Sequence, residues 1–467
     1  MRAHRFVIAF LAAVPLALAA DQYAVDWSKT SPELLEYLTA LVKIDTSDPP
    51  GNETRAAEYV KSVLEREGIP ARIYAQDPAR ANVVARLKGS GAKRPILIMG
   101  HTDVVGVQRE KWTVDPFAAV RKDGFIYGRG AQDDKSHVAT GLMLMLMLKR
   151  LNVPLDRDVI FLAESGEEGT STVGIDYMVS KHWDEIDAEY ALAEGGSTHS
   201  RDGRVTYVEI STTEKTPRGL SLVAHGTAGH ASRPLEDNAV VRLARAVARV
   251  GAWQPPLRLN ETTRAYFERL ATISPPEEAA RYRGILDPAK APEIDRYFAA
   301  HEPGLFSILR TSITPTMIKA GFRSNVIPSE AEAYLDIRAL PGEDMDKICA
   351  ELRDIIDDPK VDVMPPRSGR ANSPPSRIDS EMFRALERAQ QSMFPGAVTI
   401  PSMLTGATDM AQLRARGVQA YGFGAIVDEA DEGRHGAHAD DERLAETSLV
   451  KMAEFLWRAV IEVAAKK

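Results

Sequence analysis

The stretch PILIMGHTDVV, residues 95–105, joins a buried strand to two polar side chains. Its apolar part, 96–100, is typical of a strand covered on both faces. His101 and Asp103 follow at once, and side chains two residues apart on an extended chain point the same way. Open α/β sheets bind ligands at the carboxyl ends of their strands. The stretch predicts such a sheet, with this pair acting as a metal ligand and its orienting acid, as a general base, or as a capped turn.

Helix-like and strand-like patterns alternate on both sides of this stretch. Segment 141–151, GLMLMLMLKRL, is almost wholly apolar, and its length fits a buried helix rather than a membrane span. The alternation predicts an α/β catalytic domain with a mixed, mostly parallel sheet flanked by helices. The expected strands are 82–87, 95–99 and 159–163, and the expected early helices are 31–42 and 52–67.

The pattern changes after residue 211 and indicates a small α+β unit inserted into the larger domain. A charged, proline-punctuated helical segment, 254–310, interrupts this unit. The unit is expected to hold strands at 219–232, 312–319 and 332–339 and helices at 235–250 and 344–356, before the catalytic domain resumes with a strand at 418–423 and a last helix at 445–464. The predicted domains are a signal peptide at 1–20, catalytic parts at 21–214 and 373–467, and the inserted unit at 215–372.

The N-terminus has the composition of a secretory signal peptide. Arg2 and Arg5 precede an apolar run at 6–18, and Ala17 and Ala19 form an A-x-A cleavage pattern. A membrane anchor would need about 18 or more apolar residues, which this run does not reach. We expect an exported protein, periplasmic or secreted, with no membrane span in the mature chain.

The bulk composition narrows the function classes. The chain has 467 residues, enough for two or three domains, and a formal net charge of −8, which argues against nucleic acid or an anionic membrane as partner. Its single cysteine, Cys349, cannot form an intrachain disulfide and is expected to be a small buried side chain of helix 344–356.

Further acids and imidazoles follow apolar segments elsewhere. Adjacent acids occur in GRGAQDDK (128–135) and LAESGEEGTS (162–171), and single candidates occur in LAEGGS (192–197) and HGAHADDER (435–443). The paired acids could cap a helix, stand in solvent, or share a cation that relieves their repulsion. Oxygen and nitrogen donors without a thiolate indicate a divalent metal site with open positions, and a paired site would activate water.

The order of these motifs resembles the dinuclear zinc hydrolases that include aminoacylase, glutamate carboxypeptidase, succinyl-diaminopimelate desuccinylase and carboxypeptidase S, with the long-lid carboxypeptidase S-like members most similar. The resemblance covers nearly the whole mature chain. The matching motifs are HTD (101–103), W-x-x-x-P-F (112–117), D-G-x-x-x-G-R-G-x-x-D (123–133), EE (167–168), E (194), GHAS (229–232), NVIP (325–328) and H-x-x-x-E (438–442).

The resemblance implies two divalent metal ions, with zinc expected and cobalt or manganese as alternatives. His101 and Glu194 would bind one ion, Glu168 and His438 would bind the other, and Asp133 would bridge them.

The resemblance also implies catalytic roles. Asp103 would orient the first histidine, and Glu167 would be the general base that takes a proton from a bridging water. Asp134 has no assigned role, and His435 lies outside the motif and is interpreted as a loop residue.

The inserted unit would act as a lid. His230 would stabilise the oxyanion of the tetrahedral intermediate, although a satisfied strand histidine is the alternative. Asn325 would contact the substrate, Arg338 would grip its carboxylate, and Gly406 would lend backbone at the pocket.

The implied activity is hydrolysis of an amide bond in a small peptide or N-acyl amino acid that bears a free carboxylate. The alternatives are an aminopeptidase of the same fold and a catalytically dead exported binding protein. Relatives with short lids often dimerise through the lid, and the insertion at 254–310 puts that homodimer in doubt.

Overall fold

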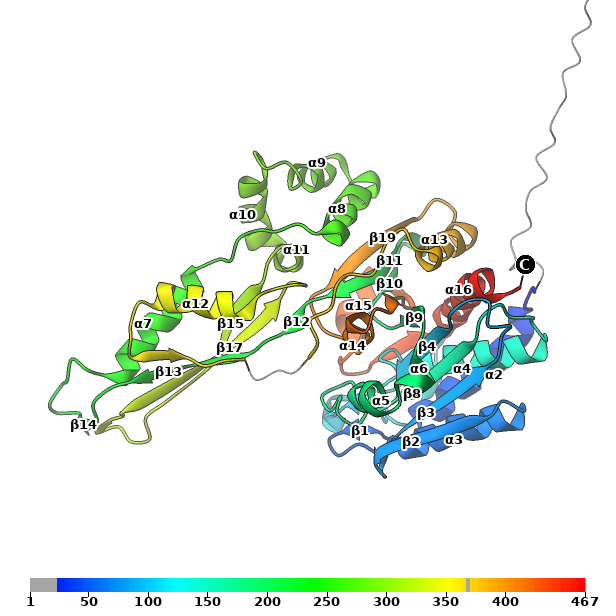
Figure 1. The fold of residues 1–467 in the computed structure, drawn as a ribbon, viewed down its shortest axis with the longest axis horizontal. Helices are drawn as coiled ribbons and strands as arrows, with labels where there is room; N and C mark the ends of the chain where they lie inside the picture. Colours follow the sequence, from blue (N-terminus) through cyan, green and yellow to red (C-terminus); the bar gives the residue numbers. More distant parts are fainter. Residues whose placement is uncertain (1–22, 367–369, 467) are drawn as a thin grey trace, which may run out of the picture.

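The computed structural model describes residues 23–366 and 370–466. The predicted signal peptide lies outside this range. The chain forms a catalytic domain and a lid that extends away from it (Figure 1). The part of the chain that the structure describes contains no helix of the length and apolarity that a bilayer crossing requires.

The catalytic domain is built on a ten-stranded mixed sheet with a parallel centre. The order is β2-β3-β8-β4-β9-β20-β11-β10-β21, and β19 pairs with β11. The strands β8, β4, β9 and β20 run parallel to one another. Their bounds are β2 Ala71–Asp77, β3 Arg80–Leu87, β4 Ile96–His101, β8 Val159–Glu164, β9 Tyr190–Ala193, β10 Ser197–Arg201, β11 Arg204–Glu214, β19 Val398–Leu404, β20 Gln419–Gly422 and β21 Ile426–Asp428.

Helices cover both faces of this sheet, as the sequence predicted. Within β4, Ile96 and Ile98 join the core on one face, and Leu97 and Met99 join the core on the other. The first face carries α2 Trp27–Val42, α3 Thr54–Arg66, α4 Lys135–Arg150, α13 Glu381–Met393 and α16 Glu446–Ala464, and the second carries α5 Ile175–Lys181, α6 Trp183–Ile186 and α14 Met410–Ala415.

Helix α4 confirms the prediction of a buried apolar helix, since its residues 135–148 are all buried. A side chain at Gly141 would come within 2.6 Å of the Phe161 ring and 3.2 Å of Ile98, so glycine lets the helix lie close to the sheet. This helix begins two residues after Asp133, which ties the position of that acid to the core.

Several short elements surround the carboxyl ends of the central strands, where the predicted metal ligands lie. One three-stranded sheet joins segments that are far apart in the chain. These elements are β1 Ser47–Asp48, β5 Val104–Val105, β6 Val120–Lys122, β7 Phe125–Tyr127, α15 Glu429–His435 and β22 Arg443–Ala445.

The lid is a five-stranded antiparallel sheet with two helices packed on one face. Cys349 is buried in this core, as predicted. The order is β12-β17-β13-β18, and β15 pairs with β17. The bounds are β12 Thr216–Pro217, β13 Leu220–His225, β15 Ser312–Ala320, β17 Glu330–Ala339, β18 Val361–Val363, α7 Ala239–Ala252 and α12 Met345–Ile356.

Two details of the lid differ from the sequence analysis. The predicted strand 219–232 breaks after β13, and a separate two-stranded ladder of β14 Gly229–His230 and β16 Val326–Ile327 forms the tip. The predicted helix at 235 starts four residues later, because the Asn238 side chain accepts the N–H groups of Val240 and Val241 and caps α7.

The helical insertion lies beside the junction of the lid and the catalytic domain (Figure 1). Phe267, Phe298 and Ile285 form its own core, which also takes in Met403 of β19. Its helices are α8 Glu261–Ile273, α9 Pro276–Gly284, α10 Ala291–His301 and α11 Pro303–Ile308.

Candidate metal centre

Three parallel strands bring acids and an imidazole together at their carboxyl ends. β4 ends at His101, which lies opposite Glu164 at the end of β8. Glu167 and Glu168 follow β8 on the next loop, and Glu194 follows β9 directly. Because β4 pairs in parallel with both β8 and β9, the three carboxyl ends meet.

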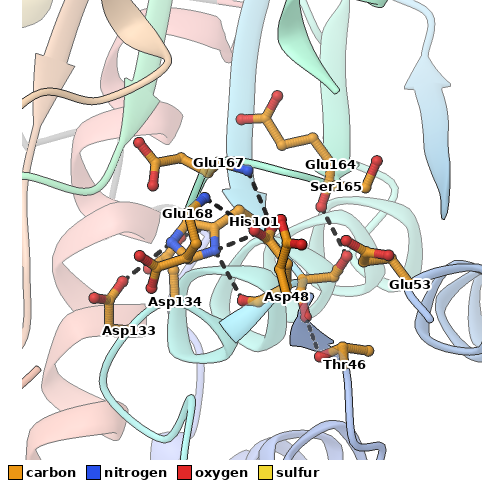
Figure 2. A network of polar contacts seen from close by, with 12 residues as sticks. Thr46, Asp48, Glu53, His101, Asp133, Asp134, Glu164, Ser165, Glu167 and Glu168 are labelled. Carbon is orange, nitrogen blue, oxygen red and sulfur yellow. Dashed lines mark hydrogen bonds and ion pairs between the residues drawn. The ribbon is translucent and has the colours of Figure 1, made fainter. Parts of the chain in front are cut away.

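Asp133 lies between two imidazoles. Its Oδ1 is 3.0 Å from Nε2 of His101, and its Oδ2 is 3.1 Å from Nε2 of His438. Nε2 of His438 is also 3.0 Å from Oε1 of Glu168, and Nε2 of His101 is 3.9 Å from Oε2 of Glu194. Figure 2 shows Asp133 and Glu168 grouped beside His101.

Two groups of side chains have ligand atoms close enough together to hold a metal ion. His101, Glu167 and Glu194 form one group, and His101, Asp133 and Glu168 form the other, with the atoms of each group within 4.8 Å of one another. Imidazole and carboxylate donors without a thiolate suit divalent ions such as zinc. Both groups contain His101, the first includes Glu167, which the sequence predicted as the base, and neither includes His438. The groups overlap the predicted ligand set and fit a divalent metal site, but they do not reproduce the two predicted ligand pairs.

Burial and mutual repulsion shift the pKa values of the acids in this cluster away from their ordinary range. Burial raises the pKa of Glu167 and Glu194 well above the ordinary value for glutamate. Hydrogen bonds to Asp133 and Glu168 raise the pKa of His438 to about 10. Such a set of groups favours a bound cation, because a cation in their midst relieves this repulsion.

The contacts of Asp103 explain why an acid lies two residues after His101. Nδ1 of His101 is 3.0 Å from the Asp103 carbonyl oxygen and 3.5 Å from its carboxylate. The same buried carboxylate accepts the backbone N–H groups of Glu167 and Glu168, at 3.2 and 2.9 Å. Asp103 thus fixes the imidazole and the loop of the paired glutamates together.

Asp134, which the sequence left unassigned, supports the end of β4. Its Oδ2 accepts the backbone N–H of His101 at 3.2 Å, and its Oδ1 pairs with Nδ1 of His137. Nε2 of His137 lies 2.9 Å from the carbonyl oxygen of Phe423. Asp134 occupies the N-cap position of α4, as the helix-cap alternative expected for one of the two acids, but its side chain makes no capping hydrogen bond.

Glu442, the last residue of the H-x-x-x-E motif, holds the loop that carries Asp133. It is fully buried, and it accepts the backbone N–H groups of Gly130, Gln132 and Asp133. Its Oε2 also accepts Nη1 of Arg129 at 2.6 Å. The sequence placed this acid in a motif but gave it no role, because its partners lie some 310 residues away.

The sequence did not reveal Arg370, whose guanidinium lies beside the carboxylate of Glu167. Nη2 of Arg370 lies 3.5 Å from Glu167 and 3.4 Å from Asp409, and Nη1 donates to the carbonyl of Thr408 at 2.8 Å. Arg370 lies in the segment between β18 and α13, where the chain returns from the lid. An isolated arginine in a loop carries no sequence signal, so only the fold reveals it.

Two further acids, Glu164 and Asp409, are buried next to His101. Glu164 and Asp409 each have a carboxylate oxygen without a hydrogen-bond partner among the described residues. Burial raises the pKa of Asp409 to about 7, and burial and Asp409 raise the pKa of Glu164 well above its usual range. Both side chains line a void of about 10 Å³, the size of one water.

The single chain does not bring His230 and Asn325 to the metal residues. His230 is exposed on β14, at the far end of the lid (Figure 1), where Ser232 donates to its Nδ1 from its backbone N–H and its hydroxyl. Asn325 is exposed beside it, and its carbonyl accepts the N–H of Ala231.

Arg338 and Gly406 lie nearer the junction of the two domains. Arg338 is near the end of β17 that pairs with β12, and its guanidinium binds the carboxylate of Asp336 at 2.8 and 3.3 Å. Gly406 is exposed in the loop after β19, and a side chain there would meet no atom within 4 Å. Neither residue contacts the metal ligands in this structure.

Solved structures share the fold. The M20 family metallo-carboxypeptidase Sso-CP2 from Sulfolobus solfataricus superimposes with a TM-score of 0.69 at 20% identity, covering 92% of this chain and 99% of that chain. The YXEP protein of Bacillus subtilis, described as a dinuclear metal binding peptidase from the M20 family, superimposes with a TM-score of 0.59 at 14% identity, covering 93% and 99%.

Sequence relatives agree with the structures. The N-fatty-acyl-amino acid synthase/hydrolase PM20D1 of Homo sapiens is 28% identical over 391 residues, covering 80% of this chain and 76% of that protein. The probable carboxypeptidase S-like 2 of Dictyostelium discoideum is 27% identical over 383 residues, covering 79% and 71%. Residues 97–462 match Peptidase family M20/M25/M40. The resemblance found in the sequence is confirmed: the chain belongs to this family and is a metallohydrolase.

Proposed function

We propose that the protein hydrolyses the amide bond of a small peptide or N-acyl amino acid that carries a free carboxylate. The observation that carries the proposal is Asp133, whose two carboxylate oxygens each face a different imidazole. The name of the human relative, an N-fatty-acyl-amino acid synthase/hydrolase, supports an N-acyl amino acid as substrate.

Five side chains would hold two divalent ions, zinc in the first instance and cobalt or manganese as alternatives. His101 and Glu194 would bind one ion, Glu168 and His438 the other, and Asp133 both. When bound, such a pair lowers the pKa of a water between the ions and polarises the substrate carbonyl.

Glu167 would be the proton carrier. A carboxylate oxygen of Glu167 lies within 4.8 Å of the ligand atoms of His101 and Glu194, which puts this acid beside the candidate centre. Its backbone is fixed by Asp103, and Arg370 lies 3.5 Å from its carboxylate. Glu167 would take a proton from the attacking water and pass it to the leaving amine.

The lid would supply the substrate contacts. Arg338 would exchange Asp336 for the substrate carboxylate, Asn325 would contact the substrate, His230 would donate to the oxyanion, and Gly406 would offer backbone at the pocket. His230 and Asn325 would arrive by movement of the lid or from the lid of a second copy.

A homodimer through the lid stays a proposal. Among the described residues, β15 pairs in the sheet only with β17, so its other edge has no strand partner, and the strand exposes Met317 and Ile318. Phe322, just beyond the strand, is 84% exposed. An apolar strand edge of this kind favours pairing with another chain.

The proton carrier is tested by Glu167→Gln, measured on metal-analysed protein. We expect unchanged metal content and a fall in kcat of at least ~10²-fold, because the amide cannot accept a proton. Glu58→Gln, an exposed glutamate of α3, is the matched control and should be neutral. Near-normal turnover of the Glu167 variant would remove this residue as the base.

The free carboxylate is tested by comparing an N-acyl amino acid with its C-terminal amide. We expect kcat/KM for the amide to be lower by roughly 10- to 100-fold, the size of a hydrogen bond to a charged group. An aminopeptidase would give the reverse pattern: it would hydrolyse peptide amides with a free amino group and reject N-acylated substrates.

Export is proposed on the N-terminal sequence alone. Expression of the full chain in a Gram-negative host, with N-terminal sequencing of the periplasmic fraction, should give a mature start near residue 20 or 21. An intact N-terminus in the cytoplasmic fraction would contradict export.

A further inference from the structure

Arg370 begins the return segment, residues 370–380, which leads from the lid to α13, and its guanidinium is held by the catalytic domain. Nη1 donates to the carbonyl oxygen of Thr408 at 2.8 Å, and Nη2 donates to Oδ1 of Asp409 at 3.4 Å. The buried carboxylate of Glu214, 4.0 Å from Nη1, accepts the backbone N–H and the hydroxyl of Thr408. These contacts fix the guanidinium independently of Glu167.

The carboxylate of Glu167 meets this fixed guanidinium. Its Oε1 is 3.5 Å from Nη2 of Arg370, and no other cationic side chain of the described residues comes within 4.0 Å of that carboxylate. The contact with Asp103 holds the backbone N–H of Glu167 and does not restrain its side-chain torsions. Arg370 is therefore the group that sets where this carboxylate points.

The place of the Glu167 carboxylate decides whether it can act as a base. An oxygen of Glu167 lies within 4.8 Å of ligand atoms of His101 and Glu194, so the side chain reaches from the guanidinium to the candidate metal centre. A general base must lie within hydrogen-bond reach of the proton that it takes. A displacement of about 1 Å can lower a rate by about 10²-fold.

The return segment also has anchors of its own. Oδ1 of Asn372 accepts the backbone N–H of Gly342, in the lid, at 2.9 Å. The hydroxyl of Ser376 donates to the carbonyl of Ala420 at 2.8 Å and accepts the N–H of the same residue at 2.9 Å. These bonds tie the segment to the lid and to β20, so its path does not depend on Arg370 alone.

We propose that Arg370 is a positioning residue for the reaction: its guanidinium holds the carboxylate of Glu167 at the place where it takes the proton from the attacking water. A guanidinium suits this task, because its donors point in fixed directions in one plane. This inference rests on the proposed function and adds a residue that lies outside every motif of the family resemblance. The alternative is a purely structural role, in which Arg370 only neutralises the buried carboxylate of Asp409.

A double-mutant cycle of Arg370→Gln and Glu167→Gln, on full-length, metal-analysed enzyme, separates the two roles. We expect Arg370→Gln to lower kcat about 10- to 100-fold with KM and metal content unchanged, because the base loses its place. In the Glu167→Gln background the same change should cost less than about twofold, since no carboxylate is left to position.

An equal loss in both backgrounds of the cycle would overturn the positioning role and leave the proposed function standing. No turnover by the metal-loaded natural chain would overturn both.

Arg370→Lys decides the matter if the glutamine variant fails to fold. The ammonium keeps a positive charge beside Asp409, but a single point donor cannot hold the Thr408 carbonyl and the Glu167 carboxylate together. We expect kcat to fall about tenfold or more, with an unfolding midpoint close to that of the natural chain. A normal kcat in this variant would overturn the role of the guanidinium.

Two control variants change the return segment without touching Glu167. Arg377→Gln removes an exposed arginine that pairs with Asp379, and Asn372→Ala removes the bond to the lid. We expect the kcat of both variants to stay within about twofold of the natural value. A loss as large as that of Arg370→Gln in either control would assign the effect to the segment as a whole and contradict the proposal.

Discussion

The metal centre and the tip of the lid both carry family motifs, but the structure builds them in opposite ways. At the centre, His101 is buried and its ring touches Asp103 and Asp133. At the tip, His230 is exposed and its ring is held by Ser232, only two residues away. One site is held by partners from distant segments, and the other is held only locally.

This difference shows which part of the chemistry the single chain completes. The candidate metal ligands are held by contacts from several distant segments, which is the arrangement a preorganised site requires. His230 and Asn325 lie on the separate lid and would reach the centre only when the lid moves or a second copy binds. Variants that remove a candidate ligand or its buried support should therefore affect metal content and stability, whereas variants at the tip should affect turnover alone.

Glu442→Ala should give the largest effect. It removes the acceptor of three backbone N–H groups and leaves Arg129 as a buried charge without its partner. Breaking a buried ion pair costs about 3–5 kcal/mol, and the Asp133 loop would lose its position. We expect loss of bound metal and of activity, measured by metal analysis and urea unfolding.

Glu446→Gln is the control for that variant. Glu446 lies four residues further on and pairs with Arg121 on the surface. We expect a change below about 1 kcal/mol and full metal content. If the two variants behaved alike, the centre would not depend on the buried clamp.

His230→Ala should leave metal content and unfolding unchanged, because the side chain is exposed and far from the ligands. Loss of an oxyanion donor typically lowers kcat by 10²–10³-fold, and we expect a fall of about that size. Loss of metal from this variant would contradict the contrast drawn between the metal centre and the tip of the lid. An unchanged kcat would return His230 to the alternative of an ordinary strand histidine.

Lys215→Met should give the smallest effect, and one that depends on pH. Lys215 lies where the catalytic domain meets the lid, and its Nζ donates to the Ser307 carbonyl and hydroxyl and to the Ser312 hydroxyl. Burial lowers its pKa from 10.5 to about 7. Between these values the unfolded chain binds a proton that the folded chain lacks, so the contribution of Lys215 to stability rises with pH.

The expected gain of the methionine variant over the natural chain is therefore largest at pH 7 and below, and fades toward pH 10. We expect the difference in unfolding free energy to shrink by roughly 2 kcal/mol over that window, at about 1.4 kcal/mol for each pKa unit, with screening and relaxation reducing the total. Lys347→Met, at an exposed lysine of α12, should show no such trend. A flat profile for the Lys215 variant would mean that this lysine stays charged when buried.

Three of the five candidate metal ligands were marked by an apolar strand before them. His101 ends an apolar strand, Glu168 and Glu194 follow two more, and parallel strands bring their ends together. Asp133 and His438 follow no such strand, and only the order of the family motifs pointed to them. The apolar strands also made the fold class predictable.

Apart from Asp103, the supporting residues were not predictable, since their roles exist only in three dimensions. Arg370 and Asp409 have no periodic pattern and no neighbour in the sequence that marks them. Glu442 works through backbone groups some 310 residues away. Sequence also missed β19, where Pro401 interrupts an apolar run, and β11, which reaches across the boundary that composition suggested.

The buried contacts of Glu442 affect the order of folding during synthesis. His438 and Glu442 are translated some 310 residues after the loop that Glu442 holds, which ends at Asp133. A nascent chain that ends between these positions lacks both the support of this loop and one candidate ligand. Stable capture of two ions is therefore expected only after residue 442 has left the ribosome.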